Sequence, residues 1–174
     1  MEEPVLKKLL NSIPQVGKVE WIGLRPAPKK EVQVVGAAQA EVGKGLIGDR
    51  FKSNYSSKRE VTLIQHEHLM TVASVLGKPE VSPKLTRRNI VVRGINLLSL
   101  KNQRFVIGEA VLETTGLCHP CSRMEENLGA GGYNAMRGHG GITARVVKDG
   151  EIKLGDQVYL EGNLVDAPAE GSSF

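Results

Sequence analysis

The residues of this chain with the clearest capacity for chemistry are its two cysteines, Cys118 and Cys121. A thiolate is both a nucleophile and a metal ligand, so a C-x-x-C pair has several possible uses. A structural zinc ion needs four ligands, and without a second C-x-x-C the others would have to come from His66, His68 or His139. A thioredoxin-like redox pair belongs in a βαβ frame, which the sequence does not show. Two buried thiols without chemistry are the third alternative.

The residues that follow Cys121 favour a functional sulfur there. Ser122 and, three residues later, Glu125 form a capping-box pattern, which predicts a short helix that begins at Arg123 and ends at Gly129. The cysteine then lies directly before a helix N-terminus, where the partial positive charge and the free N–H groups favour a thiolate. The pattern therefore predicts that Cys121 is a nucleophile or a metal ligand.

Charged and polar residues beside glycines form a candidate anion site around this cysteine. Guanidinium groups bind phosphate in a two-pronged way, and glycine lets backbone N–H groups approach an oxyanion. Arg87 and Arg145, each taken alone, are typical of solvated surface charges, and Asp49 has a second interpretation as the partner of an arginine that holds its loop shut. The residues predicted to bind a cofactor are Asp49, Arg50, Arg88, Asn89, His139, Thr143 and Arg145.

The elements that must position these residues are mostly short strands. Runs of β-branched residues and turn signals predict strands in 16–26, 32–42, 59–65 and 87–94, two strands joined at Gly108 in 104–116, and two more around an Asp149–Gly150 hairpin in 141–162. Helical spacing predicts a short amphipathic helix in 4–10 that serves in packing, a helix in 66–77 that stops at Gly77, and a brief turn of helix in 95–100. The long glycine-rich segment 43–58 is predicted to be a site loop.

Together these elements predict the fold class. About seven short strands, a few brief helices and 20 glycines indicate a mainly β protein with a closed or nearly closed β-barrel. The alternation of strand and helix that marks a Rossmann sheet is missing. We expect a single domain over residues 1–162 and a disordered tail over 163–174.

The composition of the chain limits the classes of binding partner that we expect. A net charge of +4 favours anionic ligands such as phosphate, whereas scattered basic residues and only 4% aromatic residues argue against nucleic acid. The first residues lack the apolar run of an export signal, and no stretch is long enough to span a membrane. With two cysteines, expected to be free thiols, the predicted compartment is the cytoplasm.

Several spaced motifs in this order resemble the MOSC family, the domain named after the C-terminal part of molybdenum cofactor sulfurase. The matching segments are GLIGDRF, REVTLIQHEHL, RRNIVVRGINL, AVLETT, CHPCSRME, GHGGITARVV and GEIKLGDQV. The chain is similar to a stand-alone bacterial-type member. It departs from the family pattern in one place, because many members carry His-Gly-Gly soon after the GD loop, whereas here it occurs only at His139–Gly141.

The resemblance implies a β-barrel and one functional cysteine, which either ligates the molybdenum of a pterin cofactor or carries sulfur as a persulfide. By its place after a proline, Cys121 matches that cysteine, whereas Cys118 lies outside the general pattern. Related members suggest the reduction of N-hydroxylated compounds. In two-domain sulfurases a pyridoxal-phosphate domain supplies the sulfur, so a sulfur carrier without one would need a cysteine desulfurase as partner, for metal–sulfur cluster or cofactor assembly. A non-catalytic anion-binding barrel is the third hypothesis.

Overall fold

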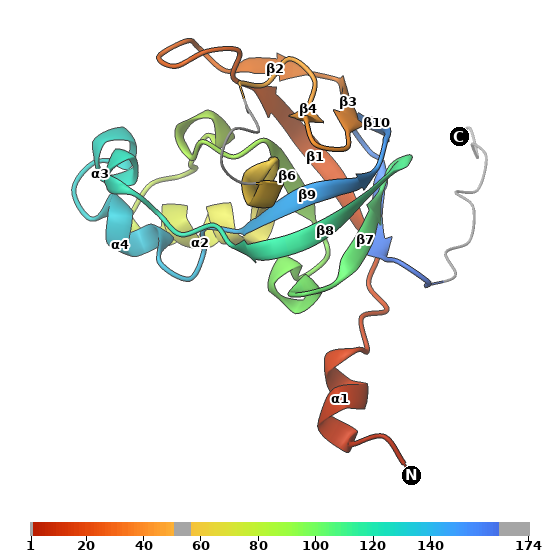
Figure 1. The fold of residues 1–174 in the computed structure, drawn as a ribbon. Coiled ribbons are helices and arrows are strands. Elements are labelled where there is room, and N and C mark those ends of the chain that lie inside the picture. Colours follow the sequence, from red (N-terminus) through yellow and green to blue (C-terminus); the bar gives the residue numbers. More distant parts are fainter. Residues whose placement is uncertain (1, 51–56, 164–174) are drawn as a thin grey trace, which may run out of the picture.

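Seven strands close into a barrel in the structure, a computed structural model that describes residues 2–50 and 57–163 (Figure 1). Neighbouring strands are antiparallel except for one parallel pair, β5 with β6. The predicted mainly β barrel of about seven strands is confirmed. The order around the barrel is β1 (Gly17–Leu24), β6 (Ile90–Arg93), β5 (Val61–Gln65), β9 (Ile142–Lys148), β8 (Ala110–Leu117), β7 (Arg104–Ile107) and β11 (Gln157–Leu160), which returns to β1.

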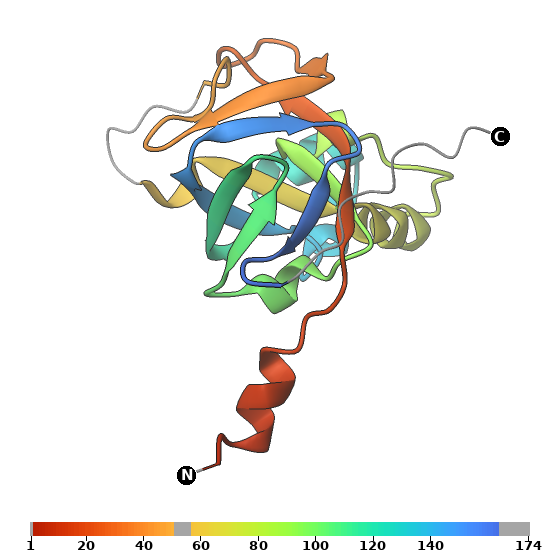
Figure 2. The same ribbon diagram turned by 90° about the vertical axis from the view of Figure 1, so that its right-hand side faces the viewer.

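A second, three-stranded sheet packs against the barrel core. It consists of β10 (Gly150–Lys153), β3 (Ala37–Glu41) and β4 (Gly45–Leu46) (Figure 2). Its Ala38, Ala40, Leu46 and Ile152 side chains join the core cluster. The prediction of a single strand in 32–42 is wrong, because this segment forms two strands separated by Gly36. The first, β2 (Gln33–Val35), pairs with the end of β1, and the second is β3.

The predicted Asp149–Gly150 hairpin is also wrong. β9 and β10 follow each other in sequence but belong to different sheets, and β10 pairs instead with β3, 110 residues earlier at the Gly150–Ala40 register. A two-residue hairpin of the predicted type needs positive φ angles, which neither residue has. Gly150 serves another purpose, because a Cβ there would collide with the backbone of Glu109 and Ala110.

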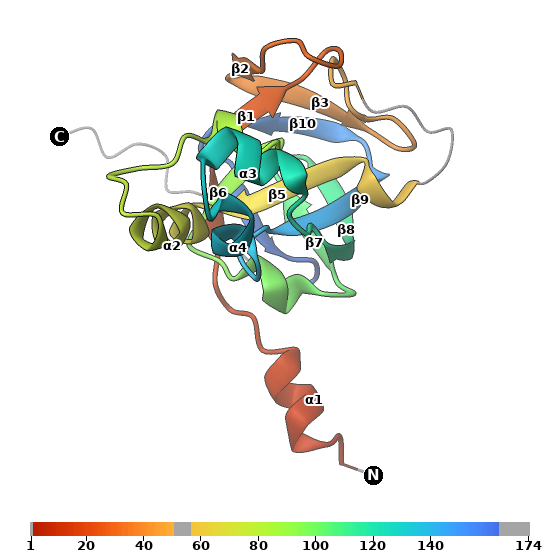
Figure 3. The ribbon, with the colours of Figure 1, turned by 90° about the vertical axis from the view of Figure 1, so that its left-hand side faces the viewer.

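Three helices cover the outside of the barrel at β5 and β6: α2 (His66–Val75), α3 (Ser122–Leu128) and α4 (Gly132–Met136) (Figure 3). Strand β5 is consequently buried on both faces, with Leu63 in the barrel core and Ile64 in the cluster formed with the helices. Such two-sided burial explains why apolar residues occupy both faces of the strand, Val61 and Leu63 on one and Ile64 on the other. The predicted helix in 66–77 is confirmed, and Gly77 after it has a φ of 64°.

The predicted N-terminal helix forms as α1 (Val5–Leu10), but its predicted packing role is wrong. All six residues are exposed, and the helix projects from the barrel (Figures 1 and 2). Three short 3-10 helices complete the elements of residues 2–50 and 57–163: η1 (Ser57–Arg59), η2 (Pro83–Leu85) and η3 (Leu97–Leu100), the last at the predicted turn of helix. Among the described residues, no helix is both long and apolar enough to cross a membrane. Of the predicted tail, only Asn163 lies within the described residues.

Candidate functional site

A polar cavity of about 530 Å³ lies at the end of the barrel where β1 and β8 finish and β5 and β6 begin. Its size falls in the range of small-molecule sites. The register explains why distant segments meet here, because β6 runs antiparallel to β1 and parallel to β5. The lining residues are Gly23, Arg25, Val32, Asp49, Arg50, Arg59, Thr62, Arg87, Arg88, Asn89, His119 and Cys121.

Positive charge dominates this cavity. Of the described residues, five arginines line it, against a single carboxylate, that of Asp49. Burial lowers the pKa of the Arg25 guanidinium below its ordinary value, and the like charges of Arg87 and Arg50 lower it further. An anion bound among these groups would relieve their mutual repulsion. The cavity is therefore suited to a ligand that carries phosphate or another oxyanion.

Cys121 opens onto this cavity. Its side chain is exposed, and the guanidinium of Arg87 donates a hydrogen bond to its sulfur with an Nη1–Sγ distance of 3.8 Å. The predicted helix follows it, but one residue earlier than expected, so that Cys121 itself is the N-cap residue and Ser122 is the first helical residue. Sequence spacing thus placed the sulfur correctly, directly before a helix.

The predicted capping box is wrong. Within the described part of the chain, the side chain of the N-cap residue Cys121 makes no capping hydrogen bond. Glu125 turns to the next helix instead, where its carboxylate accepts hydrogen bonds from the N–H groups of Gly131 (2.8 Å) and Tyr133 (2.9 Å). Those bonds hold its pKa below the ordinary value. The predicted end of α3 is confirmed at Gly129, which has a φ of 88°.

Cys118 differs from its neighbour in burial. Its side chain is 1% exposed, its N–H donates to the carbonyl oxygen of Gly141 (2.9 Å), and its sulfur accepts a hydrogen bond from Arg59 at 3.6 Å. Both cysteines are free, as predicted. The described residues contain no group of three or more His, Cys, Asp or Glu side chains that could hold a metal ion, so the zinc alternative finds no ligand set there.

Arg88 and Asn89 line the cavity, but their polar atoms are engaged by the protein. The Arg88 guanidinium donates to the carbonyl oxygens of Gly140 (2.7 Å), Thr86 (2.7 Å) and Cys118 (3.0 Å). The Asn89 amide oxygen accepts from the backbone N–H of Thr62 at 3.1 Å. Both therefore hold the strand starts and the cysteine segment in place.

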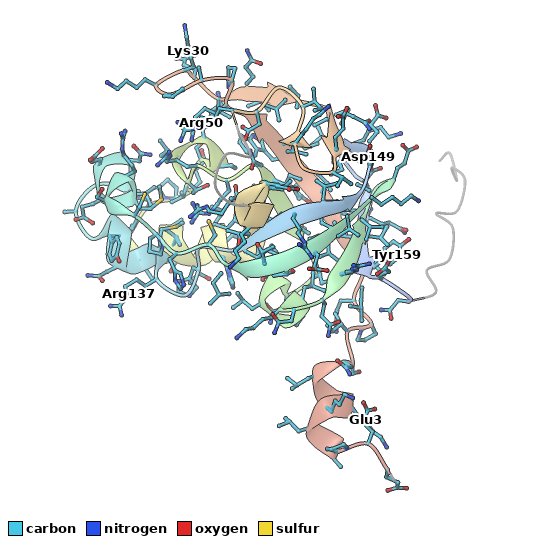
Figure 4. All side chains as sticks on the ribbon, in the orientation of Figure 1. Glu3, Lys30, Arg50, Arg137, Asp149 and Tyr159 are labelled. Atoms are coloured by element: carbon cyan, nitrogen blue, oxygen red, sulfur yellow. The ribbon has the colours of Figure 1, made fainter. Side chains whose placement is uncertain are left out.

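Asp49 and Arg50 also line the cavity and lie in the predicted site loop, which contains β4 and whose residues 51–56 fall outside the described part of the chain. The Asp49 carboxylate accepts from the backbone N–H of Arg25 (2.8 Å), and the Arg50 N–H donates to the Arg25 carbonyl oxygen (2.7 Å). Asp49 thus secures the loop through backbone rather than through an arginine side chain. Arg50 stays exposed, and in the view of Figure 4 it lies between the loop that carries Lys30 and helices α3 and α4.

Three predicted binding residues do not line the cavity: His139, Thr143 and Arg145. The His139 ring contacts the His68 ring edge-on, with 5.3 Å between centroids. The Thr143 hydroxyl lies 2.9 Å from that of Thr115, and Arg145 forms an ion pair with Glu113 on the outer barrel surface.

Sequence reasoning did not assign seven of the lining residues to the site. Among them are Arg25, Arg59 and His119, and Arg87, which taken alone was interpreted as a solvated surface charge. Arg59 lies just before a strand, as Arg88 does, so its place near a strand start could have marked it as a candidate as well. Arg25 follows the end of β1, and only the register of that strand against β6 brings it to the site. Arg87 has a φ of 59°, a left-handed conformation that is uncommon outside glycine and that no sequence pattern announced.

The fold and this cavity define a class of protein. The family model of the MOSC domain matches residues 50–159, which is well over half of the 174 residues, and the chain belongs to this family. No curated protein matches the chain.

Solved structures with the same fold include the YuaD protein from Bacillus subtilis, with a TM-score of 0.71 and 19% identity over 84% of this chain and 96% of that one. YiiM from Geobacillus stearothermophilus gives a TM-score of 0.66 and 18% identity over 83% and 74%. YiiM from Escherichia coli gives 0.61 and 17% over 86% and 72%. At these identities the likeness establishes the fold.

Proposed function

We propose that this chain binds a molybdenum-pterin cofactor in the arginine-lined cavity, with Cys121 as a ligand of the metal. The observation that carries the proposal is the convergence of five guanidinium groups and one exposed cysteine sulfur on a single cavity. MOSC domains as a family are associated with molybdenum cofactor binding or sulfur-related functions.

The donor set fits this cofactor better than it fits a bare ion. One thiolate cannot hold a free metal, and the described residues supply no cluster of further ligands. A metal that arrives with ligands of its own, as molybdenum does in a pterin cofactor, needs only one sulfur from the protein. The cofactor's phosphate needs cations, which Arg25, Arg50 and Arg87 supply.

Each residue then has a distinct task. Arg25, Arg50 and Arg87 would bind the phosphate, and the sulfur of Cys121, the N-cap residue of α3, would be the protein's ligand to the metal. Arg88 and Asn89 position the surrounding backbone. The bound cofactor would supply a redox-active metal, and the activity that we propose for it is the reduction of N-hydroxylated compounds.

A second candidate function is that of a sulfur carrier, in which Cys121 accepts sulfur from a cysteine desulfurase and passes it on. The contrast between the two cysteines favours it, because Cys121 is exposed to a partner whereas Cys118 is 1% exposed. A cysteine sulfur that accepts a hydrogen bond from a guanidinium and lies directly before a helix is also suited to attack a persulfide.

The test is to purify the protein from cells that make the cofactor and to measure molybdenum, pterin and zinc in the same sample. We expect molybdenum and pterin together, loss of the metal in Cys121→Ser, and about ten- to hundredfold weaker cofactor retention in Arg50→Ala, since a charged contact contributes about 1.5–3 kcal/mol. The matched control is Arg137→Ala, an exposed arginine outside the cavity.

Other outcomes separate the alternatives. Stoichiometric zinc without pterin would overturn the proposal in favour of a structural site. Sulfur added to Cys121 by a desulfurase, in protein that never retains molybdenum, would establish the carrier function. Binding of inorganic phosphate alone, with neither metal nor added sulfur, would leave a non-catalytic anion-binding barrel.

A further inference from the structure

Unpaired positive charge is the main electrostatic feature of the cavity. Within residues 2–50 and 57–163, no ion pair is formed by any of its arginines, which are Arg25, Arg50, Arg59, Arg87 and Arg88. The proposed function assigns three of these guanidinium groups to the cofactor's phosphate, and Arg88 is held by three backbone carbonyl oxygens. Arg59 is the cavity arginine that neither task accounts for.

The arginines come from two sides of the cavity. In the barrel, β6 lies between β1 and β5, so Arg25 after β1 and Arg59 before β5 approach from opposite sides of Arg88, just before β6 (Figure 3). Burial lowers the pKa of Arg25 most, and the arginine charges that lower it further are those of Arg87 and Arg50. Burial also lowers the pKa of Arg88 most, and there the arginine charges are those of Arg59 and Arg87. Arg59 thus belongs to the β5 side, and Arg25 and Arg50 belong to the β1 side.

The backbone on both sides of Arg59 is anchored to neighbouring strands. The Lys58 carbonyl oxygen accepts a hydrogen bond from the Thr115 hydroxyl on β8. The Glu60 carboxylate accepts one from the backbone N–H of Val146 on β9 (2.7 Å). Glu60 is only 2% exposed, whereas the Arg59 side chain is exposed and lines the cavity. The strands therefore hold Arg59 at the cavity wall, and the neighbouring carboxylate is engaged elsewhere.

The guanidinium of Arg59 has hydrogen-bond donors to spare. Its Nη2 donates to the sulfur of Cys118 at 3.6 Å, and a guanidinium carries five N–H groups. The other N–H groups can bind a carboxylate through two parallel hydrogen bonds. Cys121 lines the same cavity, so an anion held by Arg59 would share the cavity with the proposed metal ligand.

We propose that Arg59 forms a second anion subsite on the β5 side of the cavity, and that this subsite binds a carboxylate of the substrate. The assignment to the substrate rests on the proposed function, in which the cofactor's phosphate occupies Arg25, Arg50 and Arg87. It narrows the substrate class to N-hydroxylated compounds that carry a carboxylate. The β1 side then serves the cofactor and the β5 side serves the substrate.

Benzoate and benzamide, two probes of similar shape that differ in charge, test the subsite in protein purified with its cofactor. Calorimetry should show that the wild type binds benzoate about ten- to hundredfold more tightly than benzamide, and that Arg59→Gln loses this preference. Arg59→Lys keeps the positive charge and should bind benzoate more tightly than Arg59→Gln does. Arg137→Gln, a change of an exposed arginine outside the cavity, is the matched control and should keep the preference. Thermal unfolding followed by circular dichroism would show that all variants keep the barrel.

Kinetics and cofactor content give two further readouts. For two N-hydroxylated compounds that differ only in a carboxylate, Arg59→Gln should raise the KM of the carboxylated one about tenfold and leave its kcat unchanged. Both constants for the uncharged compound should stay at the wild-type value. The molybdenum and pterin content should also be unchanged in Arg59→Gln, whereas Arg50→Gln should lower it. This difference separates the subsite from the proposed function.

Three results would overturn the subsite. They are equal affinity of the wild type for the two probes, a benzoate preference that Arg59→Gln leaves unchanged, and loss of the cofactor from Arg59→Gln, which would place the cofactor and not the substrate at this arginine. A chain that never retains molybdenum or pterin would contradict the proposed function instead. The comparison of benzoate with benzamide in that chain would still decide whether Arg59 binds an anion.

Discussion

The guanidinium of Arg88 donates a hydrogen bond to the backbone carbonyl oxygen of Cys118 across 3.0 Å. A residue at the start of β6 thereby holds the segment that carries both cysteines. Two further bonds join the same guanidinium to the Gly140 and Thr86 carbonyl oxygens at 2.7 Å each. Arg88, which the sequence predicted to bind an anion, therefore serves as a clamp between three loops.

This clamp predicts a large stability effect. Arg88→Ala would leave three carbonyl oxygens around a 6% exposed side chain without their donor, and each such group costs about 1–3 kcal/mol. We expect the free energy of unfolding to fall by about 3 kcal/mol or more, measured by urea denaturation. Arg137→Ala, at an exposed position, should change it by less than about 0.5 kcal/mol. A variant as stable as the wild type would contradict the clamp.

Gly140 predicts a second effect at the same place. A Cβ there would collide with the Cys118 carbonyl oxygen and lie 3.1 Å from Nη2 of Arg88. Gly140→Ala should therefore lower the free energy of unfolding by about 1–3 kcal/mol, the usual cost of overpacking. Gly36→Ala is the matched control, since a Cβ at Gly36 meets nothing within 4 Å and its φ is not positive. Equal melting temperatures for the two variants would argue against the close approach.

The contact between His68 and His139 predicts a pH dependence of stability. Burial lowers the pKa of His68 below its ordinary value, and the neighbouring His139 lowers it further. The unfolded chain then binds a proton on His68 more readily than the folded chain does. The free energy of unfolding should rise with pH up to the ordinary histidine pKa of about 6.5 and lose this dependence above it.

Chemical denaturation of the wild type and of His68→Gln at a series of pH values would check this. The slope below the ordinary pKa should shrink in His68→Gln. His66→Gln, a change in the same first turn of α2, should retain it. An unchanged slope in His68→Gln would show that other groups cause the dependence.

Glu125 predicts the opposite direction with pH. Its pKa is lowered by hydrogen bonds from the N–H groups of Tyr133 and Gly131, so its contribution to stability is present above the ordinary carboxyl pKa and is lost as pH falls through the lowered value. Glu125→Gln should therefore be destabilised relative to the wild type at neutral pH and should converge with it in acid.

The neighbouring Glu126→Gln is the control for this prediction. Glu126 is exposed and pairs only loosely with Arg123, at 3.8 Å, so its loss should have little effect at either pH. If the two variants had the same unfolding midpoint at neutral pH, Glu125 would not be what holds the turn between α3 and α4.

The sequence predicted well those features that local patterns determine. Strands β5 to β8, helix α2 and the end of α3 at Gly129 follow from alternation, helical spacing and glycine placement. The wrong predictions concern segments whose structure depends on pairing with a strand that is distant in sequence. Asp149–Gly150 has the composition of a hairpin, but β10 buries Ile152 against the barrel by pairing with β3, and that burial outweighs the local turn preference.

The residues of the candidate site also divide into those that local patterns mark and those that distant strand pairing brings together. Cys121 was predicted from its place before a helix, and Asp49, Arg50, Arg88 and Asn89 from a glycine-rich loop and a strand start; all five line the cavity. Arg25 comes to the site through strand register, and the capping box failed because Glu125 accepts hydrogen bonds from the N–H groups of Gly131 and Tyr133 instead. A single sequence does not reveal which strands pair or which distant groups a side chain will contact.

Closure of the barrel also has a consequence for biosynthesis. The register that joins β1 to β11 pairs Gly17 with Val158, so the first barrel strand must wait for the last one. During translation, the hydrogen-bonding edges of β1 and β7 stay open until the segment with β11 has left the ribosome exit tunnel. The nascent chain is consequently most vulnerable to aggregation and to chaperone capture while β11 is still inside the tunnel, because almost the whole apolar interior then exists without the strand that seals it.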